Sequence, residues 1–144
     1  MSKLNQMNQY LSSLAVFNTK LHNLHWNVVG LQFKAVHDYT EALYDEAFQD
    51  FDAVAERLKI LGLSPYVKLS EYLESSAIKE VDAKDFQPKE VFEILQGDLE
   101  ILKNLATQIR NTADEEKDFV TVGQFEGYVE SLDKNLWFLN AINK

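Results

Sequence analysis

Apolar residues recur at steps of three and four along most of the chain, a spacing that places them on one face of a helix. Four stretches show this spacing: about 4–29, about 34–61, a third that begins at Pro88, and a fourth from about Thr121 to the end. Gly30 and Gly62 follow the first two stretches, where glycine commonly closes a helix. No run alternates apolar and polar residues over a useful length, so the pattern predicts an all-α fold.

The lengths of the connections predict the topology. About three residues join the first two helices and about eight join the last two, so each pair is expected to form an antiparallel hairpin. About 25 residues separate the second helix from the third, and Leu69, Tyr72 and Leu73 predict a short helix within this long crossover. Two hairpins joined in this way form a ferritin-like four-helix bundle. No internal boundary is evident, so residues 1–144 are expected to form a single domain.

Composition restricts the chemistry. The 144-residue chain has no cysteine, so disulfides, thiolate zinc sites and iron–sulfur clusters are excluded, and any metal must be bound by nitrogen and oxygen. The net charge is 14 − 23 = −9, which repels nucleic acid and attracts cations. No signal-peptide-like run opens the sequence, and no segment approaches the ~20 apolar residues of a membrane span. We therefore expect a soluble, cytoplasmic protein with no membrane contact.

Candidate metal ligands gather on one helical stripe. All three histidines lie between positions 22 and 37, with His25 near the end of the first helix and His37 near the start of the second. Glu41 follows His37 by four residues, and Asp52 and Glu56 form a second i, i+4 pair. Eleven residues separate Glu41 from Asp52, which is about three whole turns, so the two pairs face the same side of the helix.

Distance indicates that the two pairs cannot hold one metal within a single subunit. Eleven residues span roughly 16 Å of helix, whereas metal–ligand bonds are near 2 Å. Two copies of the second helix, packed antiparallel about a two-fold axis near Ala47, bring His37 and Glu41 of one chain to Asp52 and Glu56 of the other, and His25 can reach in from the first helix. Imidazole and carboxylate ligands suit iron(II) or manganese, and zinc less well.

Each of these features also has an ordinary structural interpretation. A carboxylate pair on a helix is most often a solvated face, and His22 is more readily a structural or surface histidine than a residue that supports a site. Trp26 is more often a core or interface aromatic than a redox participant. The matched phase of the two pairs, and the confinement of histidine to one region, favour a metal site over these alternatives.

Longer motifs add a resemblance to a known family. They comprise the run His-Trp-Asn-Val-Val-Gly at 25–30, then Phe33, His37 and Leu43-Tyr44, the run Asp-Ala-Val-Ala-Glu-Arg at 52–57, Gly62, Pro65, and Asp-Lys-Asn-Leu-Trp at 133–137. Over almost the whole chain this pattern resembles the Dps family of mini-ferritins. The resemblance implies a ferroxidase: a hollow dodecamer that oxidises iron(II), preferably with hydrogen peroxide, and stores ferric mineral, protecting against oxidative damage.

The resemblance also implies roles for individual residues. The family's di-iron site lies between two-fold-related subunits, and its ligand positions match His25, His37, Glu41, Asp52 and Glu56, with zinc or manganese as possible substitutes for iron. Trp26 matches an aromatic residue beside the site that takes up stray oxidising equivalents.

Two positions depart from the family pattern. Glu41 stands where aspartate is usual, and the added methylene changes the reach of that ligand while keeping its charge. Some relatives line a pore for iron entry with successive acids at the start of the last helix. Here Asp114 and Asp118 fall in that region, whereas Val122 and Gly123 stand where further acids are expected.

Three alternatives to a ferroxidase remain open. The first is a DNA-compacting module, since several relatives bind DNA through lysine-rich tails. With net charge −9 and only Lys3 before the first helix, we expect DNA binding to be unfavourable. The second is a cage that binds zinc or manganese without oxidising it. The third is a metal-free bundle with a polar dimer seam, in which the unpaired carboxylates would repel one another.

Overall fold

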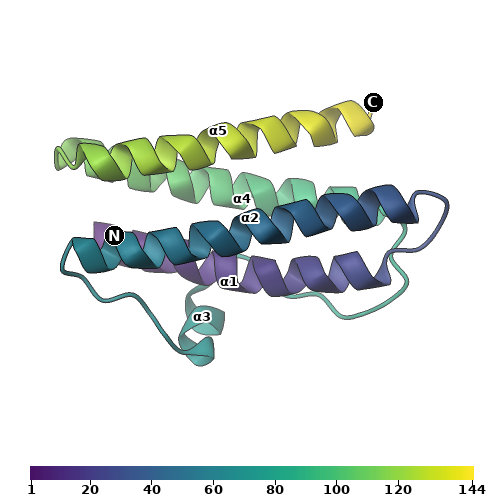
Figure 1. The fold of residues 1–144 in the computed structure, drawn as a ribbon, viewed down its shortest axis with the longest axis horizontal. Helices are drawn as coiled ribbons and strands as arrows, with labels where there is room; N and C mark the ends of the chain where they lie inside the picture. The colour runs from purple at the N-terminus through teal and green to yellow at the C-terminus, as the bar shows by residue number, and fades with distance from the viewer.

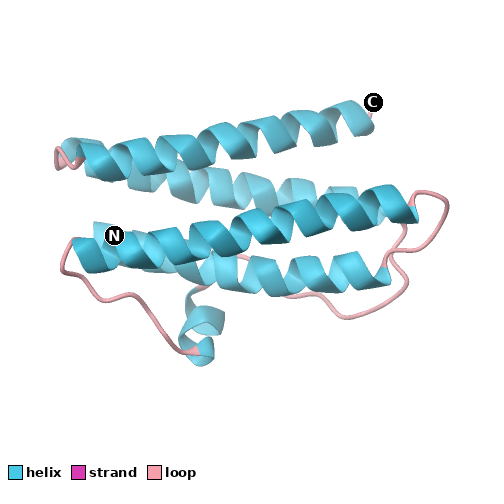
Figure 2. Cartoon of the chain, in the orientation of Figure 1, coloured by secondary structure: helices cyan, strands magenta, loops and turns pink.

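The computed structural model describes all 144 residues and contains five helices and no strand. These are α1 (Lys3–Asn27), α2 (Phe33–Ile60), α3 (Leu69–Ser75), α4 (Pro88–Glu115) and α5 (Phe119–Ile142). The α1–α2 and α4–α5 hairpins lie side by side (Figures 1 and 2). The segment that carries α3 connects the two hairpins and packs against α1. This arrangement confirms the predicted all-α, ferritin-like bundle with its short crossover helix. None of the five helices combines the length and the hydrophobicity that a membrane span requires.

The helix boundaries match the predictions within a few residues, but one connection is shorter than predicted. Gly30 and Gly62 have φ angles of 106° and 76°, the left-handed conformation expected of glycine after a helix. Only residues 116–118 separate α4 from α5, instead of about eight. Lys117 makes this tight turn possible with a φ of 60°, a conformation that no glycine or proline signals in the sequence.

The core is formed by one apolar stripe from each long helix. Its largest members from α4 and α5 include Leu95, Leu99, Leu102, Ile109 and Phe125, all almost fully buried. At the edges of the core, Phe92, Val129 and Leu136 are only partly buried. The amphipathic spacing therefore predicted the inward face of both helices, with its margins exposed to solvent.

Polar side chains of α1 attach the crossover to the bundle. The side-chain amide of Asn8 donates to the Ser64 carbonyl at 3.2 Å and accepts from the Tyr66 amide at 2.9 Å. Farther along α1, Ser13 accepts from the Ala77 amide and Asn23 donates to the Val81 carbonyl. These bonds satisfy backbone groups that lack helical partners, so they order a long connection that has little regular structure.

An ion-pair cluster closes the end of the bundle where α4 meets α5. The Asp118 carboxylate lies 2.9 Å from the Lys3 ammonium and 2.8 Å from the Arg57 guanidinium, and it accepts from the Thr121 hydroxyl at 2.6 Å. Although partial burial opposes the effect, hydrogen bonds from Thr121, Lys3 and Arg57 hold the pKa of Asp118 well below its ordinary value. Of the two acids considered for iron entry, Asp118 is therefore paired within the bundle, and Asp114 is mostly exposed with the Arg110 guanidinium 3.5 Å away.

Candidate metal centre

The two candidate imidazole ligands lie in direct contact. His25 is in the last turn of α1 and buried, and His37 is in the first two turns of α2 and half-buried. Their rings stack with centroids 3.5 Å apart and an interplanar angle of 17°. The short turn between the helices therefore brings together two histidines that are 12 positions apart in sequence.

Reciprocal hydrogen bonds fix which nitrogen of each ring is free. The Nδ1 atom of His25 lies 2.7 Å from the backbone carbonyl of His37, and the Nδ1 atom of His37 lies 2.9 Å from the carbonyl of His25. A carbonyl only accepts hydrogen bonds, so each Nδ1 must carry the hydrogen. The Nε2 lone pair of each ring is then available for a metal, which is the usual arrangement in histidine metal sites. Buried Thr40 adds a second contact, 3.2 Å from the His25 Nδ1.

The three candidate carboxylates are exposed, and only Asp52 and Glu56 lie far from the histidines along α2. Glu41, Asp52 and Glu56 are on the solvent side of α2, and none of them belongs to an ion pair within the chain. No group of three or more histidine, aspartate or glutamate side chains comes close enough in one subunit to hold a metal. The chain thus presents two separate halves of a ligand set, and the assignment of these residues stays a prediction.

Between the two halves, the exposed surface of α2 carries one aromatic ring beside polar and charged side chains such as Asp45 and Gln49. Ala47, near the expected two-fold axis, is itself buried and faces the core. The next residue, Phe48, faces outward with 63% of its surface exposed. An exposed aromatic ring therefore lies between the two halves of the ligand set, level with the expected two-fold axis.

Trp26 and two neighbouring rings lie beside the histidine half. The Trp26 side chain is 67% exposed, and its ring centroid is 5.5 Å from that of His22. His22 in turn stacks on half-buried Tyr44. Burial first, and then the negative charge of Glu41, raise the pKa of Tyr44. His22 is thus packed between two aromatic rings, as the structural interpretation of that residue predicts.

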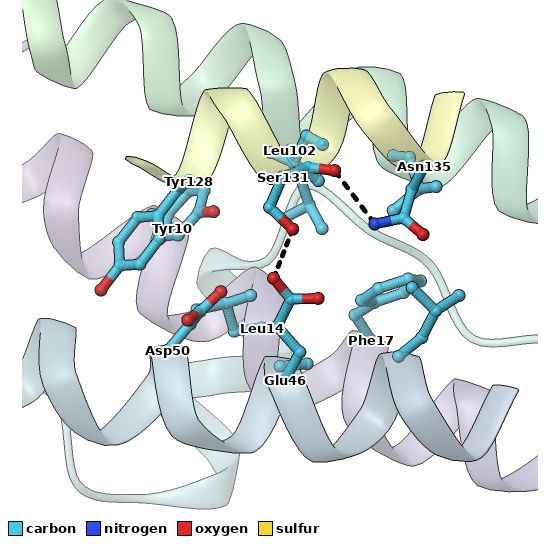
Figure 3. A pocket seen from close by; sticks show the side chains of 13 residues that line it. Tyr10, Leu14, Phe17, Glu46, Asp50, Leu102, Tyr128, Ser131 and Asn135 are labelled. Carbon is cyan, nitrogen blue, oxygen red and sulfur yellow. Dashed lines mark hydrogen bonds between the residues drawn. The ribbon is translucent and has the colours of Figure 1, made fainter. Parts of the chain in front are cut away.

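A second acidic pair, which the sequence analysis did not single out, faces the opposite side of α2. Glu46 and Asp50 line a cavity of about 30 Å³ inside the bundle, large enough for about two water molecules (Figure 3). Glu46 accepts a hydrogen bond from Ser131 of α5, and Tyr128 lines the same cavity. Burial, and then the charge of Glu46, raise the pKa of Asp50 to about 7.

The helical repeat contained a signal for this inward pair. Asp50 precedes Asp52 by two residues, which is a rotation of about 200° around the helix axis. Because Asp52 points outward, Asp50 must point into the bundle. Acidic residues are rare on the apolar, inward face of a helix, so the presence of Glu46 and Asp50 there was the signal in the sequence.

Comparisons with known proteins identify the family to which the chain belongs. A family model of the ferritin-like domain matches residues 4–144. The chain is 38% identical over 122 residues to the DNA protection during starvation protein of Helicobacter pylori, covering 85% of each chain. The crystal structure of Dps from Staphylococcus aureus is similar with a TM-score of 0.94 at 33% identity, covering 99% of this chain and 95% of that one. Dps from Listeria innocua, soaked with zinc, is similar with a TM-score of 0.93 at 33% identity, covering 98% and 95%. The chain therefore belongs to the ferritin-like family and, within it, to the Dps group that its motifs resemble.

Proposed function

We propose that the protein oxidises iron(II), preferably with hydrogen peroxide, at a di-iron site shared by two subunits, and stores the ferric product in a hollow dodecamer in the cytoplasm. The division of the ligand set carries the proposal. Two oriented imidazoles lie at one end of α2, and two carboxylates without ion-pair partners lie about three turns away on the same helix. Each half is incomplete alone, and a two-fold axis supplies the missing half to both.

The position of the axis follows from the spacing of the ligands. The midpoint between the His37–Glu41 pair and the Asp52–Glu56 pair falls at residues 46–47, level with outward-facing Phe48. In an antiparallel pair of α2 helices, His37 and Glu41 of one subunit then face the Asp52 and Glu56 of the other. His25 joins them because its ring is stacked on that of His37.

The chemistry of the donors suits iron as a substrate. Two Nε2 atoms and three carboxylates bind iron(II) well, and the carboxylates offset the additional positive charge of iron(III). Two iron(II) ions supply the two electrons that one hydrogen peroxide accepts, so peroxide is reduced to water without releasing hydroxyl radical. Zinc and manganese are expected to compete for the same ligands.

The decisive test is complementation between two inactive variants. The protein is loaded anaerobically with iron(II), hydrogen peroxide is added in stoichiometric amount, and ferric absorbance and spin-trapped hydroxyl radical are recorded. His37→Ala and Asp52→Ala are each expected to lose rapid oxidation. Random co-assembly of the two variants restores about one quarter of the sites, because half of the two-fold pairs are mixed and each mixed pair has one intact site.

Two outcomes contradict the proposal in different ways. Oxidation by the unmodified protein at the rate of buffer alone removes the ferroxidase activity and leaves a metal-binding cage. Loss in both variants without recovery on co-assembly places the site within one subunit. Native mass spectrometry tests the dodecamer separately, because the assembly must have twelve times the mass of the 16.6 kDa subunit.

We expect protection of DNA, the activity in the name of the Helicobacter pylori relative, to arise here from iron chemistry and not from DNA binding. Each subunit carries a net charge of −9, and Lys3 is occupied by Glu116 and Asp118 at 2.7 and 2.9 Å. Duplex DNA should therefore not be retarded in a gel at physiological salt. A stable complex under that condition would favour the nucleoid-compacting alternative.

A further inference from the structure

One buried hydroxyl group lies against the hydrogen bonds that orient the two candidate imidazole ligands. Thr40 follows His37 by three positions on α2, and none of its surface is exposed. Its Oγ1 lies 3.2 Å from the His25 Nδ1, 2.8 Å from the carbonyl oxygen of Val36 and 3.0 Å from that of His37. Because burial is complete within one chain, a partner subunit has no surface of Thr40 left to cover. These contacts are therefore set within the subunit.

The direction of each bond follows from the hydrogens that are present. The two carbonyls only accept, so the single hydroxyl hydrogen of Thr40 is donated to one of them. The hydroxyl oxygen can also accept, and its remaining polar contact is the His25 Nδ1. That nitrogen carries a hydrogen, because it also faces the His37 carbonyl at 2.7 Å. The Nδ1–H of His25 therefore donates to two acceptors at once, a carbonyl and a hydroxyl.

A second threonine shows what the hydroxyl does where no histidine is near. Threonine in a helix commonly donates to the carbonyl four residues earlier, and this bond requires no other partner. Thr107 on α4 donates to the Lys103 carbonyl at 2.8 Å in this way, and its side chain is exposed to water. Thr40 makes the same bond to Val36, but it is shielded from water. Without His25, the acceptor side of its hydroxyl would be buried and unpaired, which costs free energy.

We propose that Thr40 is a positioning residue for His25, whose hydroxyl fixes the orientation of the imidazole and makes its Nε2 a stronger donor to a metal. A group that accepts from the Nδ1–H of a metal-binding histidine both orients the ring and raises its basicity. His37 has one such acceptor, the carbonyl of His25 at 2.9 Å, whereas His25 has two. His25 is therefore the more firmly held of the two rings. The effect on metal affinity rests on the proposed function, and the orientation of His25 does not.

The first test measures the hydrogen bond itself in the assembled, iron-free protein. Thr40→Val keeps the shape of the side chain and removes the hydroxyl, Thr40→Ser keeps the hydroxyl, and Thr107→Val is the matched control. Solid-state NMR of the sedimented, ¹⁵N-histidine-labelled assembly at pH 8 records the Nδ1–H groups, and the signal lost in His25→Gln is that of His25. This proton should move upfield in Thr40→Val, because one acceptor is gone. It should stay in place in Thr40→Ser and in Thr107→Val.

The second test measures metal affinity with cobalt(II) and isothermal titration calorimetry. The dissociation constant should rise about tenfold in Thr40→Val, at the lower end of the range for loss of such a partner, because the His37 carbonyl still accepts from His25. Thr40→Ser should restore the affinity, and Thr107→Val should leave it unchanged. The urea midpoint of Thr40→Val should stay close to that of the unmodified protein, since the carbonyls of Val36 and His37 keep their helical partners.

A purely structural role for Thr40 predicts different results. An unmoved His25 proton in Thr40→Val, unchanged cobalt affinity in that variant, or an equal loss of affinity in Thr40→Ser would each overturn the proposal. If the unmodified assembly binds no cobalt, the shared metal site and the role of Thr40 in affinity both fall. In that case the NMR shift still decides whether Thr40 orients His25, so failure of the proposed function and failure of the positioning contact are distinguishable.

Discussion

Two acidic pairs with the same i, i+4 spacing lie on α2, and their surroundings are opposite. Glu46 and Asp50 face the cavity inside the bundle, where Ser131 donates to Glu46 and burial raises the pKa of Asp50 to about 7. Asp52 and Glu56 begin only two residues later, yet they face solvent and have no ion-pair partner within the chain. The inner pair can relieve its repulsion by retaining a proton, whereas the outer pair can do so by binding a cation. Both pairs have the same spacing, so the side of the helix on which a pair lies decides whether it is structural or a candidate for metal binding.

The largest expected effect on metal binding comes from removing an outer carboxylate. Losing a hydrogen-bond partner of a metal ligand already costs about 10–100-fold in metal affinity. We therefore expect Asp52→Ala to weaken cobalt(II) binding to the assembled protein by at least about a hundredfold, measured by isothermal titration calorimetry. The free energy of unfolding should change by less than about 0.5 kcal/mol, because the side chain is exposed. Asp50→Asn is the control, and equal loss of affinity in both variants would remove the distinction between the pairs.

A buried acid with a cationic partner should respond differently from either pair. The Asp98 carboxylate lies 2.7 Å from the Lys20 ammonium, and both side chains are almost completely buried between α1 and α4. Asp98→Ala leaves that ammonium unpaired, so we expect the free energy of unfolding to fall by about 3–5 kcal/mol in urea titrations. The double variant Lys20→Met/Asp98→Leu should recover most of this loss. A single-variant cost below about 1 kcal/mol would show that the pair is hydrated.

The next prediction concerns Asp118, whose carboxylate accepts hydrogen bonds from several donors at the edge of the bundle. Its pKa is lowered below the ordinary value of 3.8, so its contribution to stability is complete above that pH and is lost as the pH falls further. We expect Asp118→Asn to reduce the free energy of unfolding by about 2 kcal/mol at pH 7, because Lys3 and Arg57 lose a charged acceptor. Urea titrations at pH 7 and pH 3 should show the difference shrinking in acid. A pH-independent difference would contradict this assignment.

The smallest expected effect is a gain in stability. The pKa of Asp50 rises from 3.8 unfolded to about 7 folded, so the folded state retains a proton between these values and the cost of ionising the buried group is complete only above pH 7. Asp50→Asn should therefore raise the free energy of unfolding by about 1–2 kcal/mol at pH 8, allowing for partial exposure, and by much less at pH 5. Chemical denaturation at the two pH values checks it. Equal effects at both would mean that Asp50 is ionised throughout.

The residues explain which parts of the fold were predictable. Apolar spacing determined the four long helices, and the chain length between residues 62 and 88 determined the crossover, because both are properties that local sequence carries directly. The α4–α5 connection was predicted too long, since the turn depends on Lys117 in a left-handed conformation rather than on glycine. The ion pairs of Asp118 arise only when three elements meet.

The candidate site was predictable to a similar depth. Helical phase placed Glu41, Asp52 and Glu56 on the outer face, where the structure has them exposed. The stacked contact between His25 and His37, and the backbone carbonyls that orient both rings, depend on the geometry of the turn at residues 28–32 and leave no mark in the residue pattern.

The reciprocal hydrogen bonds of His25 and His37 couple the orientations of the two imidazole rings. Each ring is oriented by the main chain of the other helix, so a displacement of α1 along α2 turns both Nε2 atoms away together. An ion held by both rings correspondingly fastens the end of α1 to the beginning of α2. A metal bound at this site would therefore make the α1–α2 hairpin more rigid at its turn, where the chain reverses direction.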